Sequence, residues 1–119
     1  MAKRNEVTEV HLAVYEKEAR KWIKYLSLDQ WEVHFRLAPM DKRAQIWVNY
    51  EGRVVTFELS DTWHPEGPLT HADIKASAKH ESIELALCPL SYLGANRWQT
   101  EEEYNAAREE VVRKFEKIL

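Results

Sequence analysis

The stretch that decides the fold is KHESIELALCP, residues 79–89, because it forms the second half of a well-delimited helix. Thr70 can cap the free amides at the start of this helix, with Asp73 three residues later to complete the cap. At the other end, Pro89 is expected to prevent continuation of the helix past Cys88. The sequence therefore predicts a helix of about eighteen residues between these two signals.

The side chains of this predicted helix form two polar arcs, whereas a surface helix ordinarily needs only one. At about 100° per residue, one arc carries the reactive groups and the other carries the lysines. The first consists of Asp73, Ser77, His80, Glu81, Glu84 and Cys88, and the second of His71, Lys75, Lys79 and Ser82. Because lysines can reach water along flexible stems, we expect the first arc to face inward, toward a cleft.

The first arc has the spacing of a metal site. His80 and Glu84 are four residues apart, so their Cβ atoms lie about 6 Å apart on one helix face and can share a Zn²⁺ ion. Glu81 would lie beside the metal as a general base, as the glutamate does in H-E-x-x-H metallopeptidase helices. So short a pattern also fits a solvated or salt-bridged helix face. Cys88 fits a buried, unreactive thiol better than a nucleophile or a ligand.

The composition is typical of a single soluble domain, with 119 residues of which 45% are hydrophobic. Lysine and arginine number 17 against 20 aspartates and glutamates, and no basic run occurs, so we expect no nucleic-acid partner. The sequence has no long apolar run and no signal-peptide core, so we expect no membrane association and a cytosolic location. A single cysteine excludes an internal disulfide and agrees with a reducing compartment.

The periodicity outside the central helix predicts an α+β fold. Residues 5–26 have the pattern of an amphipathic helix, and residues 31–37 alternate between apolar and polar, as in a strand with one buried face. Two further strands, residues 43–50 and 53–59, are joined by a tight turn into a hairpin. We therefore expect an N-terminal helix, a small, mainly antiparallel three-stranded sheet, the central helix and a C-terminal helix.

The C-terminal helix is predicted to begin at Thr100, which forms a capping box with Glu103. Two acidic residues, Glu109 and Glu110, flank the apolar stripe of this helix at similar angles on opposite sides. Either one could supply a third metal ligand, and helical geometry alone does not choose between them.

Three short segments resemble a known family. They are LDQWEV at residues 28–33, HESIELAL at residues 80–87 followed by Pro89-Leu90, and EEVVRKFE at residues 109–116. The chain is similar in these segments to small zincin-like metallopeptidases of phages and prophages, which are related in core to SprT-like and minimal gluzincin proteins. The three segments are spread over the chain from residue 26 onward, and only the central one is chemically distinctive.

The resemblance implies one zincin-like domain over residues 1–119, with Zn²⁺ held by His80 and Glu84 and with Glu81 as general base. It favours Glu109 as the third ligand, with Glu110 as the alternative. Because Glu84 stands where such helices usually carry a second histidine, another divalent transition metal would also suit the site.

Three functions are consistent with these patterns. The first is a zinc peptidase of the bacterial host cytoplasm, in which metal-activated water attacks a peptide carbonyl of a substrate held by strand addition. The second is a catalytically degenerate zincin-like module of phage origin that binds a host protein. The third is nucleic-acid binding through Trp47, Trp63 or Trp98, but the sequence has no basic patch to support it. Trp47 could cover the N-terminal helix or line a substrate groove, and of these two packing is favoured. The oligomeric state is not predicted.

Overall fold

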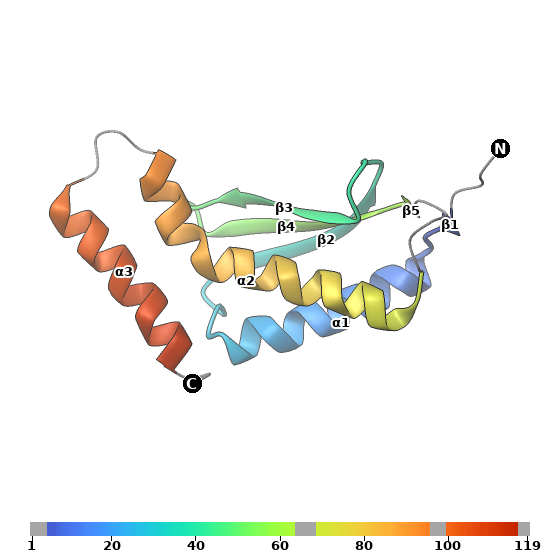
Figure 1. The fold of residues 1–119 in the computed structure, drawn as a ribbon, viewed down its shortest axis with the longest axis horizontal. Helices are drawn as coiled ribbons and strands as arrows, with labels where there is room; N and C mark the ends of the chain where they lie inside the picture. The colour runs from blue at the N-terminus through green and yellow to red at the C-terminus, as the bar shows by residue number, and fades with distance from the viewer. Residues whose placement is uncertain (1–4, 64–68, 96–99, 117–119) are drawn as a thin grey trace.

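The structure is a computed structural model that describes residues 5–63, 69–95 and 100–116. It has the predicted α+β arrangement of helices around a small sheet (Figure 1). In chain order the elements are β1 (Asn5–Glu6), α1 (Glu9–Tyr25), β2 (Glu32–Ala38), β3 (Ala44–Asn49), β4 (Val54–Ser60), β5 (Thr62–Trp63), α2 (His71–Ala95) and α3 (Glu101–Glu116).

The main sheet is mixed, not mainly antiparallel as predicted. Its strand order is β2-β4-β3, so the predicted hairpin of β3 and β4 is present and antiparallel. β4 lies between the other two strands and runs parallel to β2. The prediction was wrong because strand order depends on non-local pairing. One consequence is that β3 forms an edge of this sheet.

Two helices cover one face of the sheet, as Figure 1 shows for α1 and α2. The predicted alternation in β2 is confirmed, since Glu32, His34 and Arg36 are exposed and the apolar residues between them are partly buried. Aromatic and aliphatic side chains from both layers form the core. Its fully buried members include Tyr15, Phe57, Leu59, Ile74 and Leu85. Among the helices of the described residues, none is both long and apolar enough to cross a membrane.

α1 begins later than predicted. Asn5–Glu6 pairs with Thr62–Trp63 as a two-stranded ribbon, which the sequence patterns did not reveal. Thr8 then precedes the helix, and its backbone N–H donates to His11 Nδ1 at 2.9 Å. His11 is therefore part of the helix cap.

α2 begins with the predicted cap and ends later than predicted. The backbone N–H of Asp73 donates to Thr70 Oγ1 at 3.2 Å. The predicted stop at Cys88 is wrong, because α2 continues through Pro89 to Ala95. Proline removes one helical hydrogen bond and disturbs the preceding turn, and Figure 1 shows the C-terminal part of α2 running at an angle to the rest. Burial of Pro89 and Leu93 favours continuation despite this cost.

α3 lies beside the C-terminal part of α2 (Figure 1). Its predicted cap is confirmed, since the backbone N–H of Glu103 donates to Thr100 Oγ1 at 3.0 Å. Arg53, which has a left-handed backbone (φ 55°) at the end of the β3–β4 turn, forms an ion pair with Glu110 at 3.2 Å. This contact joins α3 to the hairpin.

Candidate metal centre

The candidate centre lies in a hollow between α2 and the edge strand β3. The hollow has a volume of about 760 Å³. α2 contributes His80, Glu81 and Glu84, and the opposite wall includes Gln45 and Trp47 of β3. The helical positions of the three α2 residues place them on one side of the helix, so they reach the hollow together.

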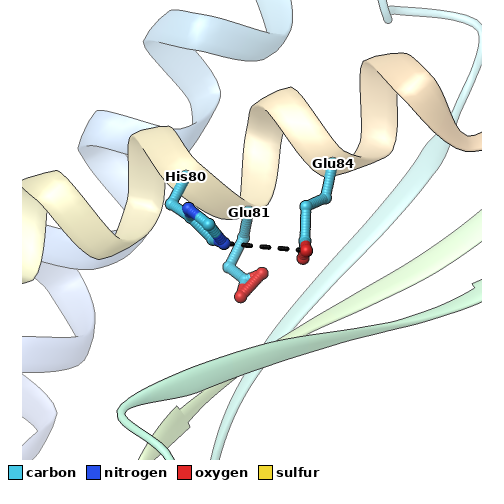
Figure 2. Close-up of side chains that lie close together, drawn as sticks. All are labelled: His80, Glu81 and Glu84. Carbon is cyan, nitrogen blue, oxygen red and sulfur yellow. Dashed lines mark ion pairs between the residues drawn. The ribbon is translucent and has the colours of Figure 1, made fainter.

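The three side chains converge, as the sequence predicted. Figure 2 shows their polar ends turned toward one another. Each offers one ligand atom, and these atoms all lie within 4.8 Å of one another. His80 Nε2 lies 3.6 Å from Glu84 Oε1. One imidazole nitrogen and two carboxylate oxygens are a suitable donor set for Zn²⁺ or a similar divalent ion, while metal binding itself stays a prediction.

The reactive arc is less enclosed than expected. The side chains of His80 and Glu84 are 70% and 53% exposed, because the edge of the sheet leaves the rim of the hollow open. Glu81 is different: only 5% of its surface is exposed. The centre therefore has a buried carboxyl group at its base and two solvent-accessible donors at its rim.

Glu81 is a carboxyl group whose surroundings favour the neutral form. Its Oε2 is buried and has no hydrogen-bond partner among the described residues. Burial, followed by the hydrogen bond and the negative charge of Glu84, raises the pKa of Glu81 to about 8, against a smaller opposing effect of Lys42. A proton or a bound cation would relieve this unfavourable charge. The unpaired oxygen therefore fits a divalent ion held in the group.

A further polar atom near the centre comes from α1. The hydroxyl of Tyr15 is buried and has no hydrogen-bond partner in the described part of the chain. Burial, followed by the negative charge of Glu81, raises the pKa of Tyr15 above its usual value. The sequence pattern did not indicate that Tyr15 lies near the centre, because a tyrosine on the apolar face of an amphipathic helix is typical of a core residue.

The two glutamates of α3 lie outside the converging group. Glu110 accepts hydrogen bonds from Arg53 at 3.2 Å and from Lys114 at 2.8 Å. Burial alone would raise the pKa of Glu110, but these two donors lower it. Glu109 is exposed and lies 4.0 Å from Arg108. The described structure thus gathers His80, Glu81 and Glu84 without a carboxylate from α3.

Trp47 differs from its prediction. It is 60% exposed and lines the hollow, and its Nε1 donates to Glu58 Oε1 at 2.7 Å. Glu58 also accepts hydrogen bonds from Gln45 and Arg36 and is only 3% exposed. The only sequence signal for this cluster was an acidic residue inside an otherwise apolar strand. The prediction that Trp47 packs against the N-terminal helix is therefore wrong.

The remaining candidates have structural roles or lie outside the described residues. Trp63 is buried, with the guanidinium of Arg43 4.6 Å from its ring centre, so its ring is not a free stacking surface. Cys88 is buried as predicted, and burial raises the pKa of its thiol to about 11, which disfavours the reactive thiolate. Trp98 lies outside the described residues.

No protein-family model matches the chain, and neither the curated proteins nor the solved structures contain a similar one. The resemblance to zincin-like proteins therefore stays a prediction from the short motifs.

Proposed function

We propose that the protein is a metal-dependent peptidase that binds Zn²⁺, or another divalent transition metal, through His80 and Glu84. The observation that carries this proposal is the convergence of three donor atoms within 4.8 Å beside an edge strand. One of them belongs to a buried carboxyl group whose Oε2 has no partner within the described part of the chain. Because the motifs resemble those of phage and prophage proteins, we expect the protein to act in the cytoplasm of a bacterial host.

Each residue has a distinct role in this proposal. His80 and Glu84 hold the ion, which would polarise a substrate carbonyl and acidify a water molecule. Glu81 accepts a proton from the attacking water and passes it to the leaving amine. Burial and Glu84 raise the pKa of Glu81 to about 8 in the metal-free protein, and a cation held by His80 and Glu84 would lower this pKa toward the working pH, where a general base works best.

The substrate in this proposal is an extended peptide. β3 is an edge strand, so its outer backbone groups are available to pair with an added strand. The same strand forms a wall of the hollow that contains His80, Glu81 and Glu84. A peptide paired with β3 would therefore run past the three donors.

Metal analysis of the purified, untagged protein tests the site. We expect about one equivalent of transition metal, as one catalytic zinc site requires. His80→Ala should lose it, because the site keeps only carboxylates. His34→Ala is the matched control, since His34 is an exposed histidine that pairs with Glu32 at 2.6 Å, away from the hollow. Metal content that is the same in wild type and His80→Ala would contradict the proposal.

The variant Glu81→Gln tests whether Glu81 acts as a general base or as a metal ligand. If Glu81 is the base, this variant keeps its metal and loses at least about a hundredfold in peptide cleavage. Cleavage is measured by mass spectrometry on denatured casein with the metal-loaded protein. A variant that loses metal and activity together would make Glu81 the third ligand, and unchanged activity would exclude both roles.

The second candidate is an interaction module without catalysis, which binds a host protein. The observations that favour it are the exposure of His80 and the engagement of Glu110 by Arg53 and Lys114. In this case a chelator should leave the melting temperature unchanged. A metal that binds only the folded state raises that temperature by mass action, so a chelator-sensitive melt would exclude this candidate.

A further inference from the structure

A second hollow adjoins the candidate centre along the same strand. Its volume is about 720 Å³, and it is lined by the C-terminal half of β3, the following turn and α2. Ile46 and Glu84 line both hollows, so the two meet at the outer carboxylate of the centre. An extended chain along β3 would cross from one into the other.

The second hollow presents apolar and aromatic surface. The rings of Tyr50 and Tyr92 are stacked, with centroids 4.6 Å apart. The hydroxyl of Tyr92 donates to Glu51 at 3.2 Å, which holds this pair at the end of the hollow. Val48 is exposed on the opposite wall, and the thiol of Cys88 is neutral because burial raises its pKa to about 11. This lining favours a large apolar side chain over an acidic one, because the carboxylates of Glu51 and Glu84 also line the hollow.

Strand geometry sets the position of that side chain in a peptide. A strand advances about 3.3 Å per residue, and alternate side chains point to the same side. A peptide bond presented to Glu84 therefore has its neighbouring side chains within a few ångströms of the second hollow. The relevant position is within two residues of that bond.

We infer that the hollow beside Tyr50 and Tyr92 is a subsite for a large aliphatic or aromatic side chain of a peptide that pairs with β3. This inference rests on the proposed function and adds a substrate preference to it. The occupant is the side chain within two residues of the bond presented to the His80/Glu81/Glu84 group.

The test is peptide binding to the metal-loaded Glu81→Gln protein, measured by fluorescence anisotropy. The probes are labelled twelve-residue peptides that differ at one position at a time, with Leu, Phe or Asp in each. At one position of the peptide, we expect peptides that carry Leu or Phe to bind at least about tenfold more tightly than the peptide that carries Asp. Val48→Asp should reduce this preference to about twofold or less, because it puts a charge in the hollow.

Val10→Asp is the matched control, since Val10 is also an exposed valine but lies in α1 away from both hollows. It should leave the preference unchanged. Tyr92→Ala gives a second test from the other wall and should also weaken binding of Phe peptides. The metal content of each variant is compared with that of wild type. If it is equal, a change in peptide preference comes from the hollow and not from loss of the metal.

Two results would overturn the inference while leaving the proposed function intact. One is binding of all peptides with no preference at any position. The other is a dimer, seen by analytical ultracentrifugation, that Val48→Asp disrupts, because a second copy of the chain would then cover this hollow. Absence of both metal and peptide binding would instead overturn the proposed function.

Discussion

Glu81 and Glu58 are two carboxyl groups with almost equal burial and opposite behaviour. They are 5% and 3% exposed. Burial alone would raise the pKa of each, and it does so for Glu81, which reaches about 8. For Glu58 the hydrogen bonds from Gln45, Trp47 and Arg36 outweigh burial, and the pKa is lowered.

The difference lies in the partners that the fold supplies. Glu58 sits in the central strand β4 and receives one donor from β2 and two from β3. Glu81 has one oxygen with no partner among the described residues and a second carboxylate, Glu84, as its neighbour. A buried acid that its own protein satisfies has a structural role, whereas one left unsatisfied is a candidate binding group.

Removal of Glu58 should have the largest effect on stability. We expect Glu58→Ala to lower the free energy of unfolding by about 3 kcal/mol, because hydrogen bonds to a charged acceptor are lost and their donors lose their partner. Urea unfolding measures the change. Glu32→Ala is the control, since Glu32 is exposed on the same face of the sheet, and it should change stability by less than about 0.5 kcal/mol. Equal effects of the two variants would invalidate the contrast.

Metal should stabilise the protein through the group at Glu81 and leave the Glu58 cluster unaffected. At a concentration of free Zn²⁺ one hundred times Kd, the free energy of unfolding should rise by about 2.7 kcal/mol. His80→Ala should remove this gain. Glu58→Ala should show the same gain, although its free energy of unfolding without metal is lower than that of wild type. A gain that survives His80→Ala would show that the metal binds elsewhere.

The two glutamates should give opposite pH dependences in metal-free protein. The pKa of Glu81 rises from 4.5 to about 8 on folding, so its contribution to stability is complete below pH 4.5 and is lost as pH rises through 8. Glu81→Gln should therefore be more stable than wild type at pH 9, by about 1 kcal/mol, and should lose this advantage below pH 4.5. The pKa of Glu58 is lowered, so its contribution is present above pH 4.5 and lost at lower pH.

Urea unfolding of wild type, Glu81→Gln and Glu58→Gln across this pH range measures both effects. If wild type and Glu81→Gln show the same pH profile, the carboxyl group of Glu81 does not have a raised pKa.

The smallest effect should come from Trp47. Trp47→Phe keeps an aromatic ring and removes the Nε1 donor to Glu58, which should cost about 0.5–1 kcal/mol. A double-mutant cycle supplies the control, because the same substitution in Glu58→Ala should cost almost nothing. Additive effects in this cycle would mean that Trp47 contributes only through its ring.

Local signals were sufficient to predict the three helices and the three strands of the main sheet, but not the short strands β1 and β5. The caps at Thr70 and Thr100 depend on residues three positions away, and the alternation in β2 is a property of seven consecutive residues. Convergence of His80, Glu81 and Glu84 was predictable for the same reason, since all three lie on one helix and helical geometry relates them.

Features that depend on distant segments were not predictable. Continuation of α2 through Pro89 depends on burial of the residues around it, and the parallel pairing of β2 with β4 depends on strand order. The donors to Glu58 come from two other strands. The position of Glu110 follows from Arg53 in a turn 57 residues earlier in the chain, which no helical pattern could indicate.

Titration of Zn²⁺ into the metal-free protein, followed by calorimetry, tests the central claim most directly. We predict a single saturable site in wild type and in His34→Ala, and its loss in His80→Ala and Glu84→Ala. Absence of saturable binding in wild type, or binding that persists unchanged in His80→Ala, would contradict a metal centre at this position.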